Sequence, residues 1–167
     1  MYRLSLIHHS DIPVNILNEV IRLKSICWPY SYDDQLKWMN EHLKGSDIHV
    51  LLSLNERNIA YLNLIEIDLV INGKTVSGLG VGNVCSEIRG NGWGTELMLR
   101  TNNILRKYKR TGLLFCRNRL VNFYGMCKWK KIDSSKMKVI FDCNNIVSMY
   151  FNYDEPIEML EFTGSIF

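Results

Sequence analysis

The sequence predicts an α+β fold, in which a mixed sheet of six or seven strands carries helices on both faces. Asn72-Gly73, the strongest hairpin signal in the chain, separates an apolar run at 59–71 from a second run at 76–85. Glycines follow the second run, and the apolar residues of 95–108 then recur at helical spacing. The order is therefore strand, hairpin, strand, glycine loop and helix.

The first part of the chain is expected to form one strand and two amphipathic helices. Residues 3–8 alternate as a strand does, and Ser10 or Asp11 before Pro13 marks a helix start. A second helix is expected behind Asp33, which is a good N-cap residue. The residues at helical spacing are Leu17, Val20, Ile21 and Lys24 in the first helix, with Lys24 at its rim, and Leu36, Met39 and Leu43 in the second.

The segment 27–32 between these helices is aromatic. Trp28, Tyr30 and Tyr32 could line a pocket for a substrate. Aromatic residues at a helix junction are also common in protein cores, so both interpretations stay open.

The strands that follow carry two acidic side chains. After a strand at 49–54, the long run 59–71 includes Glu66 and Asp68, which share one face because they are two residues apart. Paired carboxylates can act as a general base or bind a cationic amine. They can equally form the solvated face of an antiparallel sheet.

The composition fits one globular domain, residues 1–167, with 47% hydrophobic and 22% charged residues. No apolar run reaches the length of a membrane span, and no export segment opens the chain, so a cytoplasmic location is expected. The five cysteines lack a C-x-x-C pair, which indicates neither a disulfide framework nor a metal site. The basic run 106–110 complements a helix C-terminus, and neither nucleic acid nor a membrane is an expected partner.

The glycine loop is the centre of the sequence. Arg89, Gly90, Asn91, Gly92, Trp93, Gly94 and Thr95 run from the end of a strand into a helix. Alternate glycines let the backbone approach an anion, and the helix start presents unpaired N–H groups. The loop has neither the lysine of a Walker motif nor the glycine spacing of a Rossmann motif. It nevertheless predicts a phosphate site.

Two motifs resemble those of the GCN5-related N-acetyltransferases. Arg89, Gly92 and Gly94 match the pattern Arg/Gln-x-x-Gly-x-Gly/Ala of that family's pyrophosphate loop, and 122–129 resembles its Phe-Tyr-x-x-x-Gly-Phe/Trp signature. The resemblance implies a direct transfer from acetyl-CoA to an amine, with Arg89 to Thr95 on the pyrophosphate and Tyr124 as the acid that protonates the leaving thiolate.

The strand before the loop is unusually rich in glycine. Gly78-Leu79-Gly80-Val81-Gly82 indicates either a bulge with close backbone approach or tight packing against an aromatic ring. In the family this strand is bulged and splays from its neighbour. By that resemblance Gly82 and Val84 hold the thioester arm, and the N–H of Gly82 stabilises the oxyanion.

The C-terminal part is expected to close the sheet with an antiparallel pair, 136–142 and 146–153. The outline is most similar to the aminoglycoside 2′-N-acetyltransferases, whose tails end in a similar aromatic segment, and this places Phe167 at the substrate. That subfamily's strand glutamate falls at Gly80 and its C-terminal acid at Ser165. An acceptor less cationic than an aminoglycoside is therefore expected.

Two alternative functions remain open. One is transfer of a longer acyl chain, as in the nodulation acyltransferases, and the other is a silent acyl-CoA-binding sensor. The expected partner is a small-molecule amine, with a homodimer as an open option.

Overall fold

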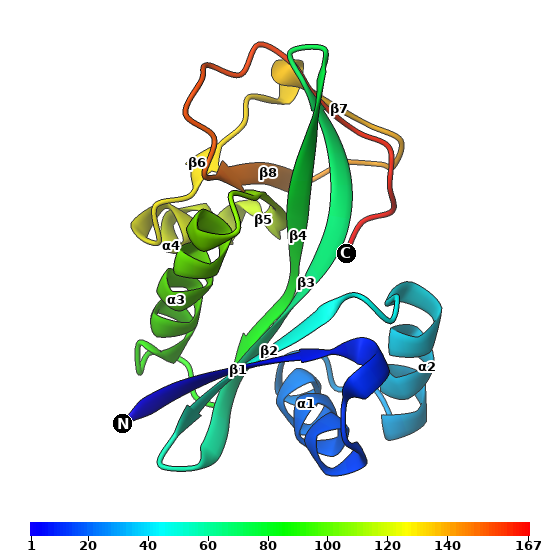
Figure 1. Ribbon diagram of the computed structural model, residues 1–167, viewed down its shortest axis with the longest axis vertical. Helices are drawn as coiled ribbons and strands as arrows, with labels where there is room; N and C mark the ends of the chain where they lie inside the picture. The colour runs from blue at the N-terminus through cyan, green and yellow to red at the C-terminus, as the bar shows by residue number, and fades with distance from the viewer. The chain divides into compact units, whose positions relative to one another are not determined.

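The computed structural model describes all 167 residues, and their contacts gather into two compact units. Unit 1 comprises 1–65 and 82–100, and unit 2 comprises 66–81 and 101–167. The helices are α1 (Val14–Cys27), α2 (Tyr32–His42), α3 (Trp93–Lys107) and α4 (Val121–Met126), with 3-10 turns at His9–Asp11, Asn118–Leu120 and Ser134–Lys136. The strands are β1 (Tyr2–His8), β2 (Ile48–Leu54), β3 (Arg57–Ile71), β4 (Lys74–Ser86), β5 (Thr111–Arg117), β6 (Lys130–Lys131), β7 (Met137–Val139), β8 (Ile146–Phe151) and β9 (Leu160–Phe162). Strands β3 and β4 and helix α3 contribute to both units. Figure 1 labels most of these helices and strands along the chain.

The hairpin predicted at Asn72-Gly73 is confirmed. Asn72 has φ +52° and Gly73 has φ +77°, the left-handed pair that a type I′ turn requires. The sheet is mixed and mostly antiparallel, and it has nine strands where six or seven were expected. The two strands that were not predicted, β6 and β9, have only two and three residues, too few to give a periodic sequence signal.

Unit 1 pairs three strands and packs two helices against them. β1 pairs antiparallel with β2 along all seven residues, and β2 pairs antiparallel with β3. Helices α1 and α2 contribute Val20, Leu23 and Met39, all fully buried, to a core shared with Leu51 and Tyr61. These apolar positions therefore fix the helices on one face of β2 and β3.

The ends of the first two helices differ from the prediction. Pro13 is the residue before α1, and His9–Asp11 forms a separate 3-10 turn, so the predicted start after Ser10 or Asp11 was too early. α1 ends at Cys27, and Trp28 is already extended, because the following proline disfavours helical dihedrals in the residue before it. α2 is capped by Ser31, not by the predicted Asp33: the Ser31 hydroxyl accepts from the N–H of Asp34 at 3.1 Å.

Unit 2 arranges its strands around β5. β5 pairs in parallel with β4 and antiparallel with β8, from Gly112↔Phe151 to Arg117↔Ile146. The antiparallel pairing predicted between 136–142 and 146–153 is wrong, because β8 pairs with β5 and β6 whereas β7 runs parallel to β9. Phe141 instead packs edge-on against Phe115 at 5.1 Å, so the segment after β7 serves the aromatic core of unit 2.

Two residues assigned to the predicted helical faces differ from the prediction in their exposure to solvent. Lys24 was expected at the rim of α1, yet it is only 2% exposed. Tyr108 was expected on the apolar face of α3, yet α3 ends at Lys107 and Tyr108 is exposed, while Leu97 and Leu105 are buried as expected. No helix is both long and apolar enough to span a membrane.

Candidate functional site

The glycine loop opens into free space at the start of α3. Gly90 has φ +85° and Gly92 has φ +76°, and a Cβ built on either would meet no heavy atom within 4 Å. The first helical hydrogen bond runs from the N–H of Glu96 to the carbonyl of Gly92 at 2.9 Å. The N–H groups of 93–95 therefore precede the hydrogen-bonded helix, an arrangement that suits an anion such as phosphate.

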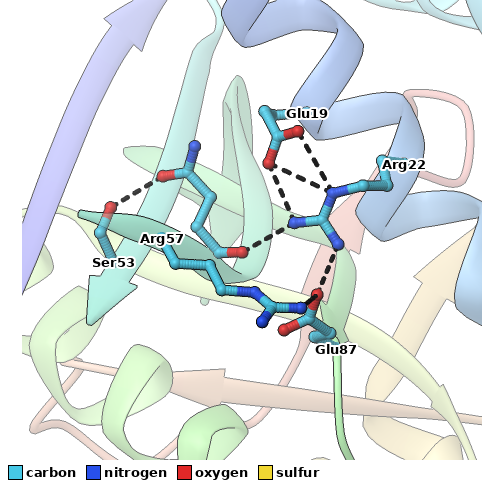
Figure 2. Close-up of polar contacts among 6 residues, drawn as sticks. Glu19, Arg22, Ser53, Arg57 and Glu87 are labelled. Carbon is cyan, nitrogen blue, oxygen red and sulfur yellow. Dashed lines mark hydrogen bonds and ion pairs between the residues drawn. The ribbon is translucent and has the colours of Figure 1, made fainter. Parts of the chain in front are cut away.

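An ion-pair network anchors the chain just ahead of this loop (Figure 2). The Oε1 of Glu87 accepts from Arg22 at 2.6 Å and from Arg57 at 2.7 Å, and Arg22 also pairs with Glu19 at 2.9 Å. Burial raises the pKa of Glu87, but the hydrogen bonds from Arg57 and Arg22 outweigh burial and hold that pKa below its usual value. The network ties the residue two positions before Arg89 to α1 and to β3.

Strand β4 carries a backbone irregularity between Gly82 and Val84. Asn83 has φ +52°, a left-handed conformation that asparagine tolerates better than most residues. Its Nδ2 donates to the Oδ1 of Asn63 at 2.8 Å, while the Nδ2 of Asn63 is buried without a hydrogen-bond partner. Asn83 was not among the residues predicted from the sequence, although an asparagine within a glycine-rich strand is a recognisable signal.

A chain of buried titratable groups lies beneath the helices of unit 1. His49 is bonded through Nδ1 to the Tyr61 hydroxyl at 2.9 Å and through Nε2 to His9 at 2.9 Å. Burial, with the charges of His9 and Lys24, lowers the pKa of His49 to about 4. Burial also lowers the pKa of Lys24 to about 8, and its ammonium lies 4.1 Å over the ring of Trp38. This chain was not predicted from the sequence, because its members come from four separate elements.

The aromatic residues between α1 and α2 lie in different environments. Trp28 is half-buried and packs on the core of unit 1, and its carbonyl accepts from Gln35 at 2.7 Å. Tyr30 is 66% exposed and Tyr32 is 45% exposed, with its hydroxyl donating to Asn18. Trp28 thus agrees with the core interpretation, whereas the two tyrosines present their rings to solvent.

In unit 2, Gly78 and Gly80 of β4 lie where a Cβ atom would collide with neighbouring side chains. β4 pairs in parallel with β5 only from Gly78↔Thr111 to Gly80↔Leu113. A Cβ on Gly80 would lie 2.6 Å from Cε1 of Phe167, so the aromatic-packing interpretation holds at Gly80. Phe167, predicted at the substrate, belongs to this aromatic cluster of unit 2.

The second motif forms α4, and a buried asparagine holds it in place. Tyr124 is 7% exposed, and its ring meets that of Phe123 edge-on at 4.9 Å. Asn102 of α3 accepts from the indole N–H of Trp129 at 2.9 Å and donates to the carbonyl of Cys127 at 2.7 Å. This role of Asn102 was not predictable from the sequence, since an asparagine on a helix is mostly exposed.

The two acidic residues of β3 lie on the surface of unit 2. Glu66 and Asp68 are both exposed, and Glu66 pairs with Arg110 at 3.3 Å. Their environment agrees with the solvated-face interpretation that the sequence left open. Ionised carboxylates on an accessible surface can still accept a proton from an amine.

No protein-family model matches the sequence, and a search of curated proteins found no match. Solved structures do match. Escherichia coli ElaA is 21% identical, with 90% of this chain and 99% of that chain covered and a TM-score of 0.65. An acyl-CoA N-acyltransferase from Pseudomonas aeruginosa is 19% identical, with 90% and 99% covered and a TM-score of 0.64.

An aminoglycoside 6′-N-acetyltransferase complexed with coenzyme A is 14% identical, with 92% of this chain and 99% of that chain covered and a TM-score of 0.66. Its acceptor position differs from the 2′ position of the subfamily that the sequence resembles, so the 2′ subtype is not specifically supported. At these identities the likeness concerns the fold. The chain has the α+β fold of the GCN5-related acyl-CoA N-acyltransferases.

Proposed function

We propose that the protein is an N-acyltransferase that moves an acetyl group from acetyl-CoA to a primary amine of a small molecule. The observation that carries this proposal is the glycine loop. Two residues with positive φ, Gly90 and Gly92, leave the N-terminus of a fifteen-residue helix open, and the loop begins with a cation, Arg89. Phosphate groups bind such helix starts through backbone N–H groups and the helix dipole.

The strand before the loop supports the same activity. Parallel pairing of β4 with β5 ends at Gly80, and Asn83 gives β4 a left-handed backbone conformation between Gly82 and Val84. A strand that loses its partner leaves backbone groups to which an extended ligand arm can hydrogen-bond. We assign the thioester arm to Gly82 and Val84, with the Gly82 N–H donating to the oxygen that gains charge in the transition state.

The proposed reaction is a direct attack by a neutral amine on the thioester carbonyl. The C–N bond forms and the C–S bond breaks. Tyr124 gives its proton to the departing thiolate, while the attacking nitrogen releases one proton to solvent, from which the tyrosine regains its own. A base must first take a proton from the acceptor ammonium, and Glu66 and Asp68 are the proposed candidates. The variants Glu66→Gln and Asp68→Asn distinguish the two candidates. Substitution of the residue that acts as the base should lower kcat/KM most at low pH, where the amine is mostly protonated.

Coenzyme binding is tested best at Gly94, the second residue of α3. Gly92 is unsuitable, because its positive φ would strain any larger residue even without ligand. Valine is no worse than glycine inside a helix, so Gly94→Val is expected to fold as wild type does. Its branched side chain, larger than the glycine or alanine of the motif, should nevertheless weaken acetyl-CoA binding by about tenfold or more, which corresponds to about 1.4 kcal/mol. Equal affinities of Gly94→Val and wild type by isothermal titration would contradict the phosphate assignment.

The same titration distinguishes the alternatives. Tight binding of acetyl-CoA with release of free thiol in the presence of amines supports the acetyltransferase. Preference for longer acyl donors indicates the related acyltransferase, and binding without turnover for any amine indicates a sensor. We further propose that the acceptor is less cationic than an aminoglycoside, because Gly80 and Ser165 stand where that subfamily has acids, and each lost charge-assisted bond removes about 1.5–3 kcal/mol.

A further inference from the structure

One buried asparagine of β3 has an amide group that the protein satisfies only in part. Asn63 is 0% exposed, and its Oδ1 accepts from the Nδ2 of Asn83 at 2.8 Å. The Nδ2 of Asn63 is enclosed and makes no hydrogen bond, and no other buried side-chain nitrogen or oxygen lacks a partner. An enclosed donor without a partner destabilises a folded protein, and native structures contain few of them. A bound molecule that supplies the missing acceptor would explain why this one is present.

The residue that faces Asn63 on the neighbouring strand does not supply the acceptor. Asn63 lies directly opposite His49 in the pairing of β3 with β2, so the two side chains share one face of the sheet. Both ring nitrogens of His49 are already bonded, Nδ1 to the Tyr61 hydroxyl and Nε2 to His9, each at 2.9 Å. The donor of Asn63 is therefore left out of this chain of hydrogen bonds.

The contact with Asn83 relates the unpaired donor to the proposed thioester site. Asn83 lies between Gly82 and Val84, the residues to which we assign the thioester arm, and its φ of +52° is left-handed. Asn83 is half-buried, so the pair of asparagines lies at the margin of the core. Both asparagines, Gly82 and Val84 belong to unit 1. The unpaired donor is thus one side-chain contact away from the backbone that would hold the arm.

We propose that the Nδ2 of Asn63 donates a hydrogen bond to a carbonyl oxygen of the acyl-CoA thioester arm. This inference rests on the function proposed above, and it adds a side-chain donor to the backbone groups of Gly82 and Val84. An uncharged amide in an enclosed place suits an uncharged acceptor, because an enclosed anion would need a cationic partner. The thioester carbonyl and the amide carbonyls of the arm are acceptors of this kind. Binding then removes the cost of an unpaired donor that the free protein carries.

The variant Asn63→Leu tests the proposal, because leucine has nearly the shape of asparagine but no polar atom. Removal of an unpaired donor should leave the melting temperature equal to or above that of wild type, since the half-buried amide of Asn83 can turn to water. Acetyl-CoA, titrated by calorimetry, should bind about tenfold more weakly, because its carbonyl loses a donor in the site. A residue with only a structural role would not lower affinity while stability is kept. Asn63→Val, which is smaller and favoured in strands, repeats both measurements in case leucine does not fit.

Asn102 is the matched control, because it is 1% exposed and its amide is bonded on both sides, to the Trp129 indole and the Cys127 carbonyl. Asn102→Leu should therefore lower the melting temperature. The analogue S-ethyl-CoA, in which a methylene replaces the thioester carbonyl, identifies the oxygen. An effect of Asn63→Leu on acetyl-CoA alone assigns the bond to the thioester, and an equal effect on both ligands assigns it to an amide carbonyl.

Two results would overturn the proposal while leaving the proposed function intact. In the first, Asn63→Leu and Asn63→Val both melt below wild type, which shows that the donor has a partner, such as an enclosed water, in the free protein. In the second, both variants bind acetyl-CoA as tightly as wild type. Failure of the wild-type protein to bind acetyl-CoA is a different result, because it overturns the proposed function and this inference with it.

Discussion

Acidification from about pH 7 to about pH 4 is expected to remove about 3 kcal/mol of folding free energy through His49 alone. His49 is fully buried between the Tyr61 hydroxyl and His9, and Lys24 adds a positive charge nearby. The folded protein therefore holds the imidazole neutral, with a pKa of about 4. In the unfolded chain the pKa of a histidine is about 6.5, so the unfolded state binds the extra proton first.

The size of the effect follows from this difference. A gap of about 2.5 pH units at about 1.4 kcal/mol per unit gives about 3 kcal/mol. The folded pKa is depressed, so this stability is fully present above about pH 6.5 and is lost as the pH falls towards about 4. A loss of this size is a large fraction of the 5–15 kcal/mol or so that stabilises a typical domain.

Urea unfolding followed by tryptophan fluorescence at a series of pH values measures this loss. Because carboxylates also titrate in this range, the quantity to compare is the difference between wild type and His49→Gln, which keeps polar atoms but cannot gain a proton. The exposed His8, changed in His8→Gln, is the matched control. A difference between wild type and His49→Gln that varies by less than about 1 kcal/mol from pH 7 to pH 4 would refute the reasoning, because His49 would then not be a buried neutral histidine.

Three further predictions concern single side chains. Lys24→Met should raise the free energy of unfolding at pH 7 by about 1–2 kcal/mol, since a buried ammonium with no carboxylate partner is replaced by an apolar chain; a lower melting temperature would contradict this. Asn102→Ala should lower the free energy of unfolding by about 2–4 kcal/mol, because it leaves the Trp129 indole N–H and a buried carbonyl without hydrogen-bond partners. Asn103→Ala, on the exposed side of α3, should lower it by under about 0.5 kcal/mol. Tyr124→Phe should lower kcat by about tenfold or more, leave acetyl-CoA affinity unchanged and abolish the high-pH limb of the kcat profile; retention of that limb would make Tyr124 a packing residue.

Several parts of the molecule could be predicted because local sequence determines them. The turn at Asn72-Gly73 depends on two residues that tolerate positive φ, and the glycine loop depends on its position before a periodic helix. Both lie where the sequence placed them. The cap of α2 was misplaced by two residues because Ser31 and Asp33 are both good N-cap residues, and only the backbone path selects between them.

By itself, the sequence determined the fold class, the hairpin and the glycine loop, since each depends on backbone preferences that act over a few residues. The tertiary structure alone decided which distant residues meet. β8 joined β5 instead of β7, Gly80 received the ring of Phe167, and Asn102 came to accept the hydrogen bond of the Trp129 indole. Such contacts depend on burial and on strand pairing between segments far apart in the chain, and no local pattern of residue types encodes them.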